Sequence, residues 1–171
     1  MAKTKNTILL EEALKKQTEK KRIYGCEEIT IGFYKDRYGN EIVDFMSLDF
    51  AGIIRCYEIK VSIQDFKSAA HKSWYGNYNY LVITSGLWME YKDYIKEILP
   101  TNIGIIIGEE LSCVRKSKYQ DIIHEQYQML LKSMIRSMYY KMRKYYNANN
   151  MSKSREKEAE IRRIKKRTIG I

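Results

Sequence analysis

The sequence predicts an α/β protein in which a mixed β-sheet is flanked by helices and followed by a basic helical extension. Three observations carry this prediction: two strand-like runs joined by a short turn, a strand–helix–strand unit directly after them, and a very uneven distribution of charge. A chain of 171 residues with 44% apolar residues has the size and composition of one globular domain with an extension. We expect the domain at residues 1–120 and the extension at residues 121–171.

The first elements are a helix and a strand. Thr7 is a residue type that caps helices, so we expect the first helix to begin there. The run 28–33 alternates apolar and polar residues, which predicts the first strand. The residues 38–40, Tyr-Gly-Asn, predict the turn that follows it.

A β-hairpin is predicted next. The runs 41–48 and 53–61 are rich in β-branched and aromatic residues, and the connector 49–52 contains a glycine. These features favour an antiparallel pair of strands. If the turn centres on Ala51, residues whose numbers sum to 102 lie opposite each other.

That register brings three charged residues together. Asp44 lies directly opposite Glu58, and because side chains alternate between the faces of a strand, Lys60 shares their face. A slip by one residue would separate them. Asp49 is the rival acid, but it lies in the turn and has the wrong parity.

Two adjacent carboxylates repel each other unless a cation lies between them. Mg²⁺ is a hard ion that takes oxygen ligands, and it is usually held by one or two carboxylates together with substrate phosphate oxygens. Lys60 could then orient an attacking water molecule. The other interpretation of Glu58 and Lys60 is a cross-strand ion pair on an exposed face of the sheet.

The residues after Lys60 predict a crossover connection. Ser62 and Asp65 have the spacing of a capping box, so a helix should start there and run through about Ser73. The run 81–84 is short and apolar, which predicts a buried strand. A strand–helix–strand unit of this kind is right-handed and makes its two strands parallel.

The remaining elements of the domain follow the same pattern. A helix is predicted over 87–99, ended by Pro100, and a buried strand over 102–107. An edge strand is expected within 111–119.

Taken together, Val43-Asp44, the run 57–66, Lys72-Ser-Trp74 and the run 78–82 resemble the PD-(D/E)xK nuclease superfamily. Within it, the chain is similar to MmcB-like DNA-repair proteins and related small phage-type proteins, over roughly residues 7 to 118. The resemblance implies a restriction-endonuclease-like fold and a role in DNA repair, recombination or phage DNA processing. Val43 stands where the family motif has a proline.

The resemblance also implies roles for single residues. Asp44 and Glu58 would be ligands of Mg²⁺ or Mn²⁺, the Ile59 carbonyl oxygen would be a candidate third ligand, and Lys60 would be the base that positions water. Many relatives carry a glutamate on the first helix, which Glu11 matches; Glu12 fits nearly as well.

The stretch 71–80 has two interpretations. Lys72 could bind a phosphate close to the metal, and Trp74, Tyr75 or Tyr78 could stack on exposed bases. Aromatic residues that enter a strand are more often part of the core.

The charge lies almost entirely at one end of the chain. Residues 1–131 hold eighteen Lys and Arg against eighteen Asp and Glu, whereas residues 132–171 hold thirteen against three. A helix capped by Asp121 would carry an apolar stripe on one face, and 147–150 would interrupt it. The basic residues of this extension are Lys132, Arg136, Lys141, Arg143, Lys144, Arg162, Arg163, Lys165, Lys166 and Arg167.

Such an extension can neutralise DNA phosphates and gain salt-sensitive, sequence-independent affinity. The alternatives are a solvated face that maintains solubility and a helix on a membrane surface. We rank DNA above the membrane because the neutral part of the chain carries a nuclease-like site. The apolar stripe could dock on the domain or pair with a second copy in a homodimer.

Other classes of protein are disfavoured. The sequence contains no apolar run of membrane-spanning length and no signal peptide, so we expect a cytoplasmic protein. Cys26, Cys56 and Cys113 suggest neither a disulfide framework nor a zinc site, and His71 and His124 lack partners at metal spacing. The expected function is therefore a metal-dependent nuclease acting on DNA, with a non-catalytic DNA-binding or repair-accessory protein as the alternative.

Overall fold

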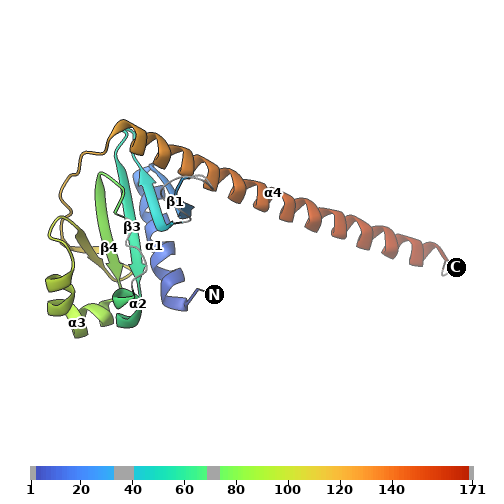
Figure 1. Ribbon diagram of the computed structural model, residues 1–171. Coiled ribbons are helices and arrows are strands. Elements are labelled where there is room, and N and C mark those ends of the chain that lie inside the picture. The colour runs from blue at the N-terminus through green and yellow to red at the C-terminus, as the bar shows by residue number, and fades with distance from the viewer. Residues whose placement is uncertain (1–2, 33–40, 69–73, 170–171) are drawn as a thin grey trace. The chain divides into compact units, whose positions relative to one another are not determined.

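The computed structural model describes residues 3–32, 41–68 and 74–169, with side chains as far as Met151. The chain forms a six-stranded mixed sheet accompanied by helices, as expected for an α/β protein (Figure 1). The strands are β1 (Tyr24–Thr30), β2 (Ile42–Leu48), β3 (Ile54–Lys60), β4 (Tyr78–Ile83), β5 (Gly104–Ile107) and β6 (Ser112–Arg115). The helices are α1 (Lys5–Lys21), α2 (Ile63–Lys67), α3 (Ser85–Ile98) and α4 (His124–Ile169).

The strands lie in the sheet in sequence order. β1, β2 and β3 pair antiparallel, β3, β4 and β5 pair parallel, and β6 returns antiparallel at the edge. The expected parallel crossover through α2 is confirmed, and α3 provides a second one. Because β3, β4 and β5 are parallel, their carboxyl ends lie together at one end of the sheet.

The hairpin of β2 and β3 has the expected register. Phe45 lies opposite Tyr57, so the turn centres on Ala51. Gly52 has a φ of 79°, a left-handed conformation that glycine adopts without steric cost and that suits the last position of a three-residue hairpin loop. The Asp49 carboxylate accepts hydrogen bonds from the backbone N–H groups of Ala51 and Ile53, each at 3.0 Å, so Asp49 is a turn residue.

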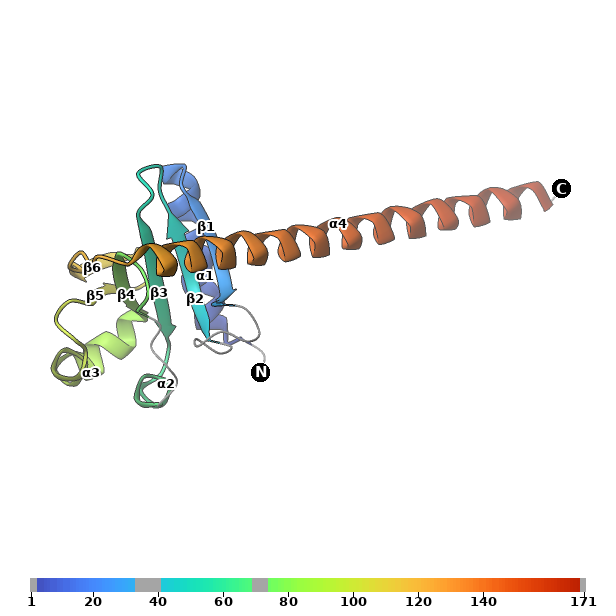
Figure 2. The same cartoon turned by 45° about the horizontal axis from the view of Figure 1, so that its top comes forward.

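The two faces of the sheet are covered by different helices (Figure 2). Leu10 and Leu14 of α1 pack with Tyr57 and Ile59 of β3 in one core cluster. The opposite face contacts α2 and α3 in a second cluster that includes Phe66. A third cluster joins β1, β2 and β3 to Leu130 and Met134 of α4.

The chain divides into two compact units, Met1–Ile135 and Arg136–Ile171. The first turns of α4 belong to the first unit, because Leu130 and Met134 are buried there and the Ser133 hydroxyl accepts a hydrogen bond from Gly32 N–H at 3.1 Å. The division therefore falls beyond the boundary at residue 120 that composition suggested.

Several element boundaries differ from expectation. Thr4, rather than Thr7, caps α1, and its hydroxyl accepts the Thr7 N–H at 3.2 Å. The helix after β3 is capped by Ser62 as expected, but it ends at Lys67 instead of continuing to Ser73, because Ser68 is already extended. The predicted turn at 38–40 and the end of that predicted helix lie outside the described residues.

The start and the continuity of α4 also differ. The helix begins at His124, so Asp121 is not its cap. It continues through 147–150, where an interruption was expected. Asparagine lowers helix propensity only moderately, and Lys144, Ala148 and Met151 are good helix formers.

Two glycines give a matched test of the packing. A Cβ atom on Gly104 would lie 2.4 Å from the Tyr80 ring and 2.8 Å from the Ser117 backbone nitrogen, whereas a Cβ on Gly86 would have no neighbour within 4 Å. We expect Gly104→Ala to lower the free energy of unfolding by about 1–3 kcal/mol through overpacking. Gly86→Ala should raise it by about 0.4–1 kcal/mol, because alanine restricts the unfolded chain. Urea denaturation of both variants checks this, and equal effects would contradict the described packing.

Candidate active site

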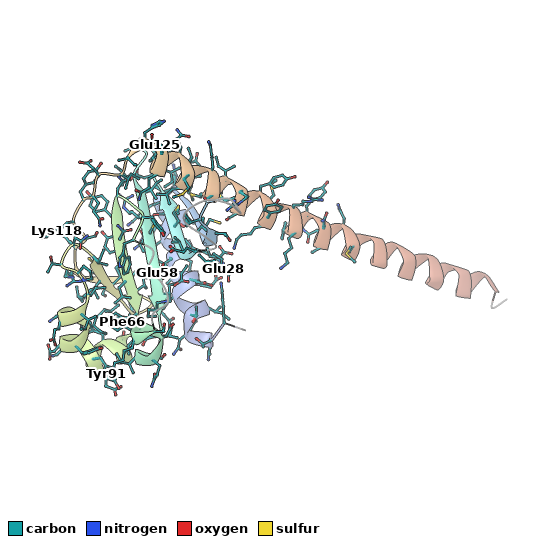
Figure 3. All side chains as sticks on the ribbon, in the orientation of Figure 1. Glu28, Glu58, Phe66, Tyr91, Lys118 and Glu125 are labelled. Carbon is teal, nitrogen blue, oxygen red and sulfur yellow. The ribbon has the colours of Figure 1, made fainter. Side chains whose placement is uncertain are left out.

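Asp44, Glu58 and Lys60 meet at the carboxyl end of β3. Continuing the hairpin register by one residue places Asp44 opposite Glu58, and the two carboxyl groups share a hydrogen bond. The Lys60 ammonium lies 3.7 Å from Glu58 Oε2. Glu58 is 2% exposed and Lys60 8% exposed, so both side chains are largely enclosed by the protein, whereas Asp44 is partly exposed. Figure 3 labels Glu58 on the sheet.

The Asp44 side chain takes the place of a backbone group in the hairpin. Backbone pairing between β2 and β3 is found from Phe45 to Leu48, and at the next position the Ile59 N–H donates to Asp44 Oδ2 at 2.8 Å. The carboxylate is thereby fixed beside the β3 backbone. Ile59 contributes its N–H group to this arrangement, whereas the resemblance had suggested its carbonyl oxygen as a ligand.

Burial raises the pKa of Asp44. The Ile59 N–H, the Lys60 ammonium and the hydrogen bond with Glu58 each oppose this rise, and the negative charge of Asp65 adds to it. Asp44 therefore holds its proton more firmly than an isolated carboxyl group does. A cation between the two carboxylates would replace that proton.

The donor set fits a hard divalent ion. Asp44 and Glu58 offer carboxylate oxygens close enough to share one hydrogen, and such oxygens are the ligands that Mg²⁺ and Mn²⁺ prefer. Within the described ranges, no group of three or more His, Cys, Asp or Glu side chains is arranged to hold a metal. An ion bound here would complete its coordination with water and substrate oxygens.

Glu11 faces inward, but it pairs with Lys3 and not with Asp44, Glu58 or Lys60. Glu11 is 5% exposed, while the Glu12 side chain is 51% exposed, which favours Glu11 as the inward carboxylate of α1. Its Oε1 lies 2.6 Å from the ammonium of Lys3, which also lies 2.8 Å from Glu28. α1 packs against the Tyr57 face of β3, whereas Glu58 alternates to the other face.

Glu28 was not among the expected site residues. β1 pairs with β2 through Glu27–Phe45 and Ile29–Val43, so Glu28 lies between these two pairs, and its φ of 48° is left-handed. Glu28 and Glu58 are both labelled in Figure 3. The long connection between β1 and β2 concealed this register in the sequence.

Asp65 is a second residue that the sequence did not assign to the site. Its Oδ1 lies 3.8 Å from the Lys60 ammonium, so Lys60 is placed between Glu58 and Asp65. The Ser62 hydroxyl accepts the Asp65 N–H at 3.1 Å, which fixes the first turn of α2. The capping-box spacing of Ser62 and Asp65 could have indicated this placement, because it puts Asp65 in the first turn of a helix that begins soon after Lys60.

The aromatic residues after α2 make contacts within the protein. Trp74 packs against the core cluster of α2 and α3. The Tyr75 hydroxyl donates to the Glu41 carboxylate, and the Arg55 guanidinium lies 5.5 Å from the centre of the Tyr78 ring. These contacts favour the core interpretation of this stretch. Lys72 lies outside the described residues.

The basic residues of the extension all lie on α4. Lys132 is exposed on the part of α4 that belongs to the first unit. In the second unit, Arg143 and Lys144 are exposed, and Arg136 and Lys141 are partly exposed. The last five, whose side chains are not described, follow on the same helix: Arg162, Arg163, Lys165, Lys166 and Arg167.

The raised pKa of Asp44 predicts how the stability of the protein depends on pH. The folded protein keeps a proton on Asp44 at pH values where the unfolded chain has lost it, so the free energy of unfolding should fall as pH rises from the ordinary carboxyl pKa towards the raised one. Asp44→Asn removes the titrating group and can keep both hydrogen bonds. We expect this variant to melt at a higher temperature than wild type at pH 7, with the difference shrinking towards pH 4.

Asp49→Asn is the matched control. Burial alone would raise the pKa of Asp49, but the hydrogen bonds from Arg55 and the turn N–H groups outweigh it and lower that pKa. Removing this carboxylate should therefore lower the melting temperature at pH 7. Thermal denaturation between pH 4 and pH 8 measures both effects. A fall in melting temperature at pH 7 for Asp44→Asn would contradict the raised pKa of Asp44.

Comparisons with known proteins bear on the fold. No protein-family model matches the chain, and no curated protein matches it. It is similar to a solved structure described as the SPO1766 protein of unknown function from Silicibacter pomeroyi, with 17% identity and a TM-score of 0.64. The similarity covers 86% of this chain and 96% of that chain. Among the described residues, no helix combines the length and apolarity that crossing a membrane requires. The shared architecture is an α/β fold with a mixed sheet.

Proposed function

We propose that this protein is a metal-dependent nuclease that hydrolyses phosphodiester bonds in DNA. The observation that carries the proposal is the convergence of Asp44, Glu58 and Lys60, two carboxyl groups and one ammonium, at the carboxyl end of β3. A bound Mg²⁺ or Mn²⁺ ion would supply an activated water molecule and would neutralise charge on the phosphate. Asp44 and Glu58 are the residues that would hold it.

Lys60 has a positioning role in this proposal. Its ammonium is placed between the carboxylates of Glu58 and Asp65 and is largely shielded from solvent. An ammonium group can donate three hydrogen bonds, so it can hold a water molecule or a phosphate oxygen while it contacts both carboxylates. Because Lys60 lies two residues after Glu58 on β3, its side chain shares the face of Glu58 and its ammonium reaches the carboxylates of Glu58 and Asp65.

The basic helix α4 would bind the DNA backbone. From residue 136 to the end, the chain holds twelve Lys and Arg against three Glu. Contacts of this kind are insensitive to base sequence and depend strongly on salt. Affinity for DNA would thus reside mainly in α4, and cleavage in the sheet.

A non-catalytic DNA-binding protein is the second candidate. The observation that favours it is that Asp44, Glu58 and Lys60 already satisfy one another: the two carboxyl groups share a hydrogen bond, and the Lys60 ammonium lies 3.7 Å from Glu58 Oε2. Such a cluster could serve as a buried polar network that stabilises the hairpin. α4 would then account for the function alone.

Cleavage of supercoiled plasmid and of a four-way junction separates the two candidates. With Mg²⁺ or Mn²⁺, wild-type protein should cut at least one substrate, and EDTA should stop the reaction. Lys60→Ala should lose most of this activity, whereas Lys92→Ala, which alters an exposed lysine of α3, should retain it. If wild type cuts neither DNA nor RNA with any divalent metal, the non-catalytic function takes precedence.

A further inference from the structure

A cavity of about 320 Å³ lies at the edge of the sheet where the candidate active site is found. Lys60 is in register with Ile83, and Ile83 with Ile107, across three adjacent parallel strands. The next residues of β4 and β5, Thr84 and Gly108, line the cavity. Neighbouring strands are about 4.8 Å apart, so the cavity and Lys60 lie at the same end of adjacent strands, with the cavity on the α1 side and Lys60 on the face opposite α1.

Three segments form its walls. Asn6, Leu9 and Leu10 come from α1, Ser85 and Gly86 from the start of α3, and Glu109 and Glu110 from the loop after β5. These segments converge because the parallel crossovers bring the carboxyl ends of the strands to one edge. Ligands of α/β proteins are commonly bound at this edge.

The charged side chains of the walls disfavour a phosphate as the main occupant. Among the described residues, no lysine or arginine lines the cavity, and two carboxylates do. A Cβ on Gly108 would lie 2.6 Å from Glu110 Oε2 and 2.7 Å from Ser85 Oγ, so a carboxylate and a hydroxyl are both placed over Gly108. An anion would be repelled there, whereas a group with N–H donors would be accepted.

The remaining walls suit a partly apolar molecule. Leu9 and Leu10 offer an apolar surface, and the Asn6 amide both donates and accepts hydrogen bonds. Ligand pockets typically measure about 300–1,000 Å³, so this cavity has room for one small ligand. A nucleobase has an apolar face and an edge of donors and acceptors, which matches these walls.

We propose that the cavity binds one unpaired nucleobase of a nucleic-acid strand, with Glu110 accepting hydrogen bonds from the base edge. The proposal rests on the proposed function, since the base would belong to a strand whose phosphate lies at Lys60. It deepens that function by naming the substrate as a nucleic acid with an unpaired base near the cut. Bases with an exocyclic amino group, such as cytosine, are favoured over thymine, because a carboxylate accepts from that group.

Nucleoside titrations of the full-length protein test this directly. Deoxycytidine and thymidine are titrated without metal, and the backbone amide signals of Gly86 and Gly108 are followed by NMR. Deoxycytidine should shift both signals and bind several-fold more tightly than thymidine. Glu110→Gln should weaken deoxycytidine binding by roughly tenfold, the loss expected for one charge-assisted hydrogen bond.

Gly86 provides a steric variant with its own control. Gly86 lines the cavity and a Cβ on it has no neighbour within 4 Å, so Gly86→Leu adds a large side chain at the cavity wall without a backbone clash, and Gly86→Ala adds only a methyl group. The leucine variant should abolish nucleoside binding, and the alanine variant should keep it. If the leucine variant fails to fold, Glu110→Gln decides the test.

Two results would overturn the inference: no shift with either nucleoside, or equal binding to wild type and Gly86→Leu. Shifts with spermidine and none with a nucleoside would assign the cavity to a cationic ligand and would also overturn it. The outcome is independent of catalysis. Nucleoside binding without cleavage would overturn the nuclease proposal alone, and cleavage without nucleoside binding would overturn only the base site.

Discussion

Replacing Glu58 with glutamine is expected to reduce metal-dependent DNA cleavage by at least about a hundredfold. Glu58 is 2% exposed, shares a hydrogen bond with Asp44 and lies 3.7 Å from the Lys60 ammonium, so it contacts both other members of the site. The glutamine amide keeps the shape and hydrogen-bonding capacity but removes the charge that a divalent ion requires. Losses of about 10²–10³ are usual when one electrostatic contact to the reacting group is removed.

The same substitution should leave DNA binding in EDTA nearly unchanged, because phosphate affinity is assigned to α4. Glu12→Gln is the control, since it makes the same chemical change on an exposed glutamate of α1. Cleavage rates and EDTA binding are measured for wild type and both variants. Equal cleavage by wild type and Glu58→Gln would remove Glu58 from the mechanism.

Deleting residues 150–171 is expected to weaken nonspecific DNA binding and to make it less sensitive to salt. The deletion removes eight Lys and Arg and three Glu, a net loss of five positive charges. Each lost phosphate contact lowers the slope of log affinity against log salt by roughly 0.9 on duplex DNA, so a decrease of several units is expected. The first unit ends at Ile135, so the melting temperature of the domain should change little.

A charge-matched variant isolates the cause of this effect. Replacing the eight Lys and Arg of residues 150–171 with glutamine keeps the length of the helix and removes its positive charge. It should reproduce the effect of the deletion on the salt slope. An unchanged slope in both variants would show that this segment is a solvated appendage, and unfolding of the truncated protein would show that it contributes to a core or a subunit interface.

The β2–β3 hairpin was predictable because local chemistry determines it. A glycine at the left-handed position and Asp49 in the turn specify a three-residue loop, and that loop fixes the register that sets Asp44 opposite Glu58. The crossover after β3 was predictable for a similar reason, since Ser62 caps α2 by bonding the N–H three residues later.

The contacts of Glu11 could not be predicted in this way. They depend on Lys3 and Glu28, which come from separate elements whose relative placement is set by packing between α1 and the sheet. The sequence also did not reveal that the first turns of α4 belong to the first unit. Leu130 and Met134 continue the same apolar stripe as the residues after them, and only their burial against β1, β2 and β3 distinguishes them.

Paramagnetic relaxation by Mn²⁺ tests whether Asp44 and Glu58 hold a divalent ion. Mn²⁺ is added in small amounts to ¹⁵N-labelled protein, and the broadening of each backbone amide signal is recorded. We expect the amide signal of Ile59, whose N–H donates to Asp44, to be among the most strongly broadened, and Asp44→Asn to abolish this effect. Broadening that centres on Glu109 and Glu110, or that persists in Asp44→Asn, would contradict this expectation.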